Sequence, residues 1–154
     1  MELCEFIQPQ AVFTGVRVSS KTEALGVLAK EAACRCGQQE RMILDALVER
    51  ERLGSTGVGS GIAVPHARLS GLNRLCAVFL RLDRPIDFES VDERPVDLLF
   101  LVLSPETAGA DHLKALSQVS RLLRNDVLCR ALRRATDPVT LHSLLVGQCG
   151  SVAA

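Results

Sequence analysis

Apolar residues in the first half of the chain follow two periods. From Val12 to Val18 they alternate with polar or small residues, which is the period of a strand with two unequal faces. A capping-box pattern, Ser20-Lys21-Thr22-Glu23, then opens a stretch with helical spacing that ends at Gly37. A second helical pattern covers Gln38–Leu53, and the charges in its last turn, Glu49-Arg50-Glu51-Arg52, are typical of a solvated face. The pattern predicts a strand followed by two helices.

The second half of the chain alternates apolar runs with amphipathic segments. The runs predict three strands and a short edge piece, in the order Ile62–Val64, Leu75–Leu82, Ile86–Phe88 and Val96–Leu103. Helical spacing then predicts three helices, near Asp111–Arg124, Asp126–Arg134 and Pro138–Val146. Strands that alternate with helices in this way, joined by short connections, indicate an α/β fold with a mixed sheet.

The chain of 154 residues fits one domain, since this length can bury about two-thirds of the surface that the unfolded chain exposes. We predict a single domain over residues 1–154, with a core from about residue 12 to residue 145. Residues 147–154 are expected to form a short irregular tail.

Composition and charge exclude several classes of function. Lys plus Arg equals Asp plus Glu, 18 of each, so no net charge draws the protein to nucleic acid or to an anionic membrane. Trp and Tyr are absent, which removes the usual stacking platforms for single strands. The longest strongly apolar run, Leu98–Leu103, is too short to span a bilayer, and the N-terminus lacks a signal-peptide pattern. We therefore expect that the protein does not bind nucleic acid, does not insert into a membrane and is located in the cytoplasm.

The cysteines follow neither metal-ligand nor disulfide-framework spacing. There are six, at Cys4, Cys34, Cys36, Cys76, Cys129 and Cys149. The nearest two, Cys34 and Cys36, point about 200° apart on a helix and cannot easily share a ligand. We expect reduced thiols, no metal site and no cofactor.

The most informative segment runs from Gly54 to His66 and reads Gly-Ser-Thr-Gly-Val-Gly-Ser-Gly-Ile-Ala-Val-Pro-His. Its glycines allow consecutive backbone N–H groups to face an anion. It is not a P-loop, because it ends in Gly61-Ile62-Ala63, and a helix rather than a strand precedes it, unlike a dinucleotide fingerprint. Ser55 and Ser60 lie in no nucleophile elbow. ATP, NAD and serine hydrolysis are therefore disfavoured.

His66 is the candidate nucleophile of this segment. Pro65 restricts the backbone before it, so the imidazole is presented with little freedom. A lone histidine is more often structural than catalytic, and His112 taken alone is as well explained as a capping or buried histidine. Arg50 at the end of one helix and His112 at the start of another favour a phosphoryl site with His66. His142 is expected to be structural or exposed.

At these residues the chain resembles the fructose/mannitol type of phosphotransferase-system (PTS) enzyme IIA, and most closely its nitrogen-regulatory branch. Residues 50–66 reproduce the family block R-E-x-x-G-S-T-G-(I/V)-G-x-G-(I/V)-A-(I/V)-P-H with its spacing. Supporting matches are Arg94–Phe100 and His112-Leu113-x-x-Leu116-Ser117, and the resemblance covers about Val12 to Leu145.

The resemblance implies a fold and a set of roles. The fold is the EIIA type-2 fold, a mixed sheet of about five strands flanked by helices on both faces. His66 is the phosphorylated nucleophile, His112 the supporting histidine and Arg50 the residue that stabilises the phosphoryl group. In that family the donor is a phosphohistidine on a small HPr-like carrier, which is charged from phosphoenolpyruvate, and neither ATP nor a metal is required.

Three functions follow from these observations. The first is a nitrogen-regulatory IIA protein, a phosphotransferase-type carrier that regulates targets such as sensor kinases or transporters according to its phosphorylation state. The second is a sugar-specific IIA component that passes phosphate to a IIB domain. The third, of another class, is an interaction module that is never phosphorylated. Our hypothesis is the first.

Overall fold

The structure is a computed structural model that describes residues 2–152, with side chains up to residue 147. Its helices are α1 (Leu3–Phe6), the 3₁₀ helix η1 (Pro9–Ala11), α2 (Lys21–Cys36), α3 (Glu40–Arg52), α4 (Ala110–Leu123), α5 (Asp126–Arg134) and α6 (Pro138–Val152). Its strands are β1 (Val12–Val16), β2 (Gly57–Gly59), β3 (Ile62–Ala63), β4 (His66–Leu69), β5 (Cys76–Ile86) and β6 (Val96–Pro105). The thiol of Cys149 lies outside the described side chains.

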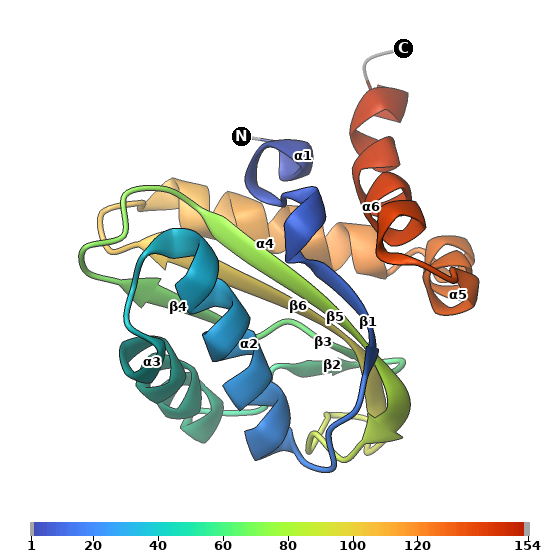
Figure 1. Ribbon diagram of the computed structural model, residues 1–154, viewed down its shortest axis with the longest axis horizontal. Coiled ribbons are helices and arrows are strands. Elements are labelled where there is room, and N and C mark those ends of the chain that lie inside the picture. The colour runs from blue at the N-terminus through green and yellow to red at the C-terminus, as the bar shows by residue number, and fades with distance from the viewer. Residues whose placement is uncertain (1, 153–154) are drawn as a thin grey trace.

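The strands form one mixed sheet, in the order β1-β5-β6-β3-β2, with β4 paired to β6 beyond the end of β3. The long central pair β5–β6 is antiparallel, whereas β1 runs parallel to β5, and β3 and β4 run parallel to β6 (Figure 1). The mixed sheet is confirmed, with six strands in place of about five. Strands β2 and β4 were not predicted, whereas the predicted edge piece at Ile86 belongs to β5.

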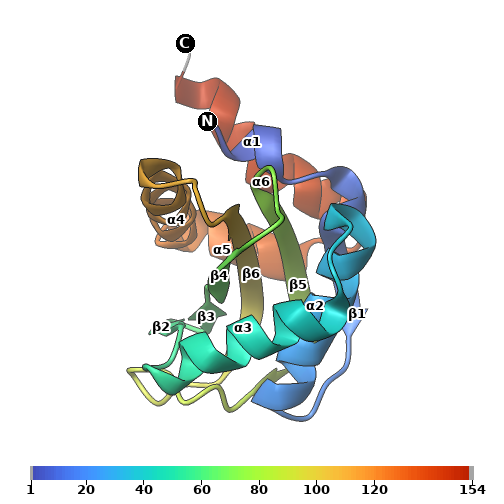
Figure 2. The same ribbon diagram turned by 90° about the vertical axis from the view of Figure 1, so that its left-hand side faces the viewer.

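Helices cover both faces of the sheet, as predicted. On one face α2 and α3 pack over alternate residues of β5 and β6, and on the other α1, α4, α5 and α6 bury the remaining ones (Figures 1 and 2). Both faces of β6 are therefore buried, which explains why its sequence is apolar nearly throughout. No helix within residues 2–152 is long and apolar enough to cross a membrane.

The packed core begins earlier than predicted, and the last helix ends later. Leu3, Phe6 and Ile7 are buried against the cluster that contains α6, where the sequence pattern placed the start of the core near residue 12. His142 of α6 donates from Nε2 to the carbonyl of Ile7 at 3.1 Å, which gives this histidine the structural role expected for it. The tail expected from residue 147 is instead helical as far as Val152.

Strand β5 is longer than its apolar run because it includes the predicted edge piece at Ile86. Ile86 pairs with Val96 of β6, after an irregularity in the ladder that begins at Arg81. Pro85 has no N–H to donate, and a bulge is one of the few places where a strand tolerates proline. Phe88 follows β5 and is fully buried. The edge piece and the main strand are thus one element.

Candidate functional site

His66 is held in place by the parallel ladder between β4 and β6. Its backbone is in register with Val102, and the Val102 N–H donates to the carbonyl of Pro65 at 3.0 Å. The preceding strand β3 pairs with the same β6 a few residues earlier, so the chain on both sides of Val64 and Pro65 is anchored. The half-buried imidazole therefore projects from a strand that is held rigidly by its pairing with β6.

Hydrogen bonds fix the tautomer of the His66 ring. Nδ1 lies 2.9 Å from the carbonyl oxygen of Val64, which can only accept, so Nδ1 carries the proton. Nε2 lies 3.1 Å from Nε of Arg50, which can only donate, so Nε2 carries a lone pair. The neutral ring therefore presents Nε2 as its nucleophilic atom.

Arg50 reaches His66 from the last turn of α3. A second bond, from its Nη1 to the carbonyl of Gly54 at 2.9 Å, holds the guanidinium over the end of its own helix. The guanidinium has five N–H groups, and within the described residues only these two bonds engage them. Donors are therefore left over for an anion beside Nε2 of His66.

His112 comes from the first turn of α4, on the opposite helical layer. Its ring is buried, and its centroid lies 5.7 Å from that of His66 with the planes tilted by 56°. Nδ1 of His112 lies 2.6 Å from Oγ of Ser104, a fully buried residue of β6. Ser104 thus orients the ring, an arrangement that the sequence did not reveal, since the two residues belong to different elements.

Burial sets the charge of both histidines. The pKa of His66 is lowered from 6.5, first by desolvation and then by the Arg50 charge, against the Val64 hydrogen bond and the Glu51 charge, which raise it. The pKa of His112 is also lowered, first by desolvation and then by the charges of Arg68 and His66. Both rings are therefore neutral near pH 7.

Glu51 is a second residue beside the site whose role the sequence analysis did not predict. Its side chain is 6 % exposed and pairs with Nζ of Lys21 at 2.7 Å, so the solvated face predicted for residues 49–52 is wrong at this position. Glu51 also accepts hydrogen bonds from the N–H and the hydroxyl of Thr56. A signal was present, because Glu51 follows the buried Ile43 and Leu47 at steps of four and so lies on the buried stripe of α3.

The glycine-rich segment is a small hairpin of β2 and β3 rather than an open cradle. Four of its N–H groups already have partners within the chain, at Gly54, Thr56, Gly57 and Ser60. Gly57 is needed for close packing, because a Cβ there would lie 3.1 Å from Cα of Ser90. Gly61 is needed for a different reason, since its φ of +81° is strained for other residues. The prediction of an anion site built from the loop amides is therefore wrong at these four positions.

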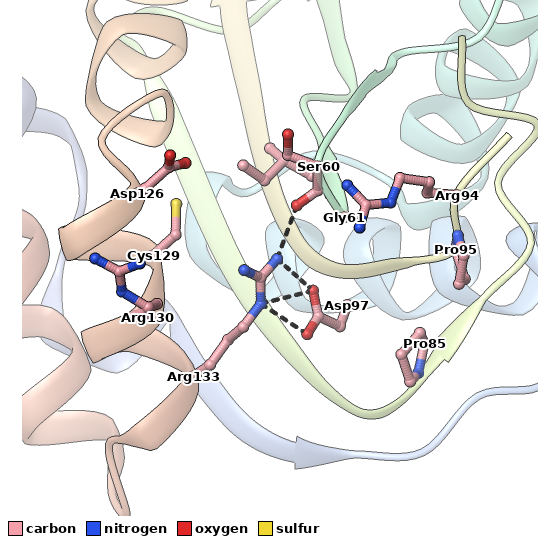
Figure 3. Close-up of a pocket in the computed structure, with 11 residues that line it drawn as sticks. Ser60, Gly61, Pro85, Arg94, Pro95, Asp97, Asp126, Cys129, Arg130 and Arg133 are labelled. Atoms are coloured by element: carbon pink, nitrogen blue, oxygen red, sulfur yellow. Dashed lines mark hydrogen bonds and ion pairs between the residues drawn. The ribbon is translucent and has the colours of Figure 1, made fainter. Parts of the chain in front are cut away.

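A pocket of about 500 Å³ lies away from the histidines, between α5 and the start of β6 (Figure 3). At its centre Arg133 donates to Asp97 at 2.9 Å and to the carbonyl of Ser60 at 3.0 Å. From Asp97 to Val102, the partner of His66, strand β6 runs roughly 17 Å. The pocket is therefore separate from the Arg50, His66 and His112 cluster, and the sequence pattern did not predict it.

Comparison with known proteins decides the family. Residues 5–147 match the model of the family described as the phosphoenolpyruvate-dependent sugar phosphotransferase system, EIIA 2. The chain belongs to this family. In the EIIA 2 family it is 48% identical over 145 residues to a nitrogen regulatory protein of Bradyrhizobium diazoefficiens, covering 94% of this chain and 95% of that protein. It is 34% identical over 146 residues to a nitrogen regulatory protein of Escherichia coli K12, covering 94% and 90%.

Solved EIIA structures confirm the predicted EIIA fold. The nitrogen regulatory protein IIA-Ntr of Neisseria meningitidis superimposes with a TM-score of 0.89 at 26% identity, over 93% of this chain and 98% of that one. The mannitol IIA protein of Escherichia coli superimposes with a TM-score of 0.75 at 19% identity, over 90% and 98%, and shows the fold alone. The roles of Arg50, His66 and His112 stay predictions.

Proposed function

We propose that this EIIA 2 protein accepts a phosphoryl group on Nε2 of His66 from an HPr-like phosphocarrier and regulates target proteins according to its phosphorylation state. The observation that carries the proposal is the hydrogen bonding of the His66 ring. Val64 holds the proton on Nδ1, and Arg50 faces the lone pair on Nε2. A neutral imidazole with a directed lone pair beside a guanidinium is suited to attack on phosphorus.

The transfer exchanges one nitrogen–phosphorus bond for another. Nε2 of His66 attacks phosphorus while the bond to the donor imidazole breaks, and the charge on the three equatorial oxygens grows in the loose transition state. The Arg50 N–H, which first donates to the lone pair on Nε2 of His66, then donates to these oxygens instead. Because histidine replaces histidine, the step is expected to be nearly thermoneutral and reversible.

His112 is proposed to steady the same oxygens from the other helical layer. When the Ser104 hydroxyl donates to Nδ1 of His112, the ring proton lies on Nε2, where it is a donor. Lowering of the His112 pKa keeps this ring neutral, so it offers one N–H without repelling Arg50. Removing a preorganised donor of this kind costs on the order of 10²- to 10³-fold in rate.

The regulatory role is supported by the names of the relatives. Nitrogen regulatory proteins match over more than nine-tenths of this chain, at identities from 34% to 48% in the two cases above. We infer a nitrogen-regulatory role in the cytoplasm, with protein targets such as sensor kinases or transporters that distinguish phosphorylated from free His66.

The test is phosphorylation of the purified protein by phosphoenolpyruvate, the first PTS enzyme and an HPr-like carrier. One acid-labile phosphate is expected per chain. It should be absent from His66→Ala and retained by His142→Gln, a matched control at a histidine outside the site. Retention of the phosphate by His66→Ala would overturn the assignment.

A sugar-specific role is the second candidate, since a fructose-specific EIIA component of Haloferax volcanii is 40% identical over 102 residues, 66% of this chain and 66% of that protein. A phosphorylated sample incubated with a fructose or mannitol IIB domain separates the two. Rapid transfer to the IIB domain would favour sugar uptake, whereas phosphate that stays on His66 favours regulation. A protein that never carries acid-labile phosphate in cells would instead be an interaction module.

A further inference from the structure

The pocket between α5 and the start of β6 is built from three segments that are far apart in the sequence (Figure 3). One segment is the β2–β3 hairpin, the second joins β5 to β6, and the third is α5. The volume of about 500 Å³ lies within the usual range of small-molecule sites, roughly 300 to 1,000 Å³. The fold therefore creates a hollow large enough for a metabolite.

Helix α5 presents one face to the pocket. Cys129, Arg130 and Arg133 follow Asp126 by three, four and seven residues, which places all four on the same side of the helix. Cys129 is buried, and burial raises the pKa of its thiol, so it contributes an uncharged surface. The charged groups of this face are two guanidiniums and one carboxylate.

Arg133 is held in one orientation at the centre of the pocket. Its Nε donates to both oxygens of Asp97, and its Nη2 donates to Asp97 and to the carbonyl of Ser60. Gly61 leaves room for these bonds, because a Cβ there would lie 2.7 Å from Nη2 of Arg133. The N–H groups of Nη1 make no hydrogen bond within the described side chains, so they can serve a ligand.

Two further guanidiniums, those of Arg94 and Arg130, line the pocket without a partner. Both residues are exposed, and their side chains make no hydrogen bond or ion pair within residues 2–147. Arg94 lies on one side of Arg133 and Arg130 on the other (Figure 3). Because Asp97 is paired with Arg133, the only lining carboxylate that opposes these two charges is that of Asp126. The lining residues therefore leave an excess of positive charge.

We propose that this pocket binds a small organic molecule that carries a carboxylate or phosphate group, with Arg94, Arg130 and Nη1 of Arg133 as its donors. A guanidinium can donate two parallel N–H bonds to either kind of oxyanion, so both groups are recognised by the same chemistry. The buried side chains of Ile62 and Cys129 offer apolar contact to the carbon part of the ligand.

Binding in this pocket does not depend on the proposed phosphorylation. None of the residues that line it belongs to the cluster of Arg50, His66 and His112. An anion could nevertheless also bind at that cluster, because Arg50 has N–H groups to spare. The experiment must therefore report which of the two places a ligand occupies.

The experiment is a nitrogen NMR titration of the full-length protein with glycerol 3-phosphate and with succinate. Glycerol is the neutral control, and sodium chloride keeps the ionic strength constant. We expect saturable shifts of the Gly61 amide and of the Arg133 Nε–H with at least one of the two anions. A response to glycerol 3-phosphate alone assigns the site to phosphate esters, a response to succinate alone assigns it to carboxylates, and a response to both supports the shared chemistry.

Single substitutions test the proposed donors. Arg94→Gln and Arg130→Gln should each weaken binding about tenfold, because each removes a charge-assisted donor. Arg134→Gln is the matched control, since Arg134 is exposed on the same helix but does not line the pocket. Asp126→Asn should instead strengthen binding, because a carboxylate that repels the anion is lost. Arg133 is left unchanged, because its ion pair is part of the fold.

Three results would overturn the proposal. Shifts confined to Arg50 and His66 would place the anion at the phosphoryl site instead of the pocket. Shifts equal to those caused by sodium chloride alone would show that only ionic strength acts on these residues. Equal affinities in Arg130→Gln and Arg134→Gln would show that the guanidinium facing the pocket contributes nothing to binding.

Discussion

Nε of Arg50 lies 3.1 Å from Nε2 of His66, so the arginine occupies the lone pair that the proposed reaction uses. The contact keeps the ring aligned and places the guanidinium where phosphoryl oxygens would arrive. Arg50 must leave the nitrogen as phosphorus approaches it. In the proposed reaction the role of Arg50 would therefore change, from a donor to the nucleophile to a donor to the transferred group.

Replacing Arg50 with Gln should slow phosphorylation of His66 by on the order of 10²- to 10³-fold, because a preorganised cationic donor is lost. The matched control is Arg52→Gln, two residues further along, whose side chain is 70% exposed and pairs with the exposed Glu49. Phosphate incorporation from the HPr-like carrier, measured under single-turnover conditions, checks both variants. Equal rates in the two variants would contradict the role of Arg50.

Phosphorylation should tolerate acid better than an unperturbed histidine allows. The pKa of His66 is lowered from 6.5, so Nε2 keeps its lone pair as the pH falls through 6.5, and the rate should decline only below that value. Removing the Arg50 charge, one of the causes that lower this pKa, should move the midpoint to higher pH. An NMR titration of the His66 ring in the wild type and in Arg50→Gln measures it. A wild-type titration midpoint at or above pH 6.5 would contradict the lowering of the His66 pKa by burial and by Arg50.

The same shifts make stability depend on pH. Between the lowered pKa values of folded His66 and His112 and the value of 6.5, the unfolded chain binds more protons than the folded one. The free energy of unfolding should therefore fall as the pH falls through this window, and these two histidines should have no effect above it. Urea titrations on either side of pH 6.5 test this, and His66→Gln should reduce the slope.

Truncation of Glu51 to Ala should destabilise the protein by about 3 to 5 kcal/mol, the usual cost of removing one partner of a buried ion pair. The variant leaves Lys21, 17% exposed at its side chain, without its carboxylate and the Thr56 N–H without an acceptor. Glu49→Ala is the control, because its pair with Arg52 is exposed and worth about 0 to 1 kcal/mol. Denaturant unfolding compares them, and similar losses would refute the buried role of Glu51.

Ser104→Ala should leave the fold intact but free the ring of His112. Loss of the bond to Nδ1 is expected to cost about 1 to 3 kcal/mol of stability, since a buried ring nitrogen loses its partner. Nitrogen NMR of His112 should show a changed tautomer balance, a signal that a merely structural role would not produce. Phosphoryl transfer should slow while the affinity for the carrier stays the same.

Residues that act within one short segment were predictable from the sequence, and residues joined by folding were not. Arg50 and His66 lie in one contiguous block, so its spacing pointed to both. Ser104 acquires its partner His112 only when β6 and α4 are packed together, and no local pattern encodes that contact. Strand β4 was missed because it is four residues long and half of its residues are polar or charged.

The glycine content of the loop led to the wrong prediction of an anion site built from its amides. It showed that the backbone from Gly54 to Gly61 can adopt unusual angles, and Gly59 and Gly61 do so. It did not show which acceptors the freed N–H groups would meet. Glu51 and Asp92 supply two of them from within the chain.

Arg50 and His112 stand on opposite sides of the sheet, the first on α3 and the second on α4. A phosphoryl group on His66 that contacts both residues would bridge the two helical layers. Loss of the phosphoryl group would remove the contacts to both layers at once, although the nucleophile His66 belongs to a single strand. On the proposed function, a partner protein that contacts either layer would then respond to the phosphoryl group without contacting it.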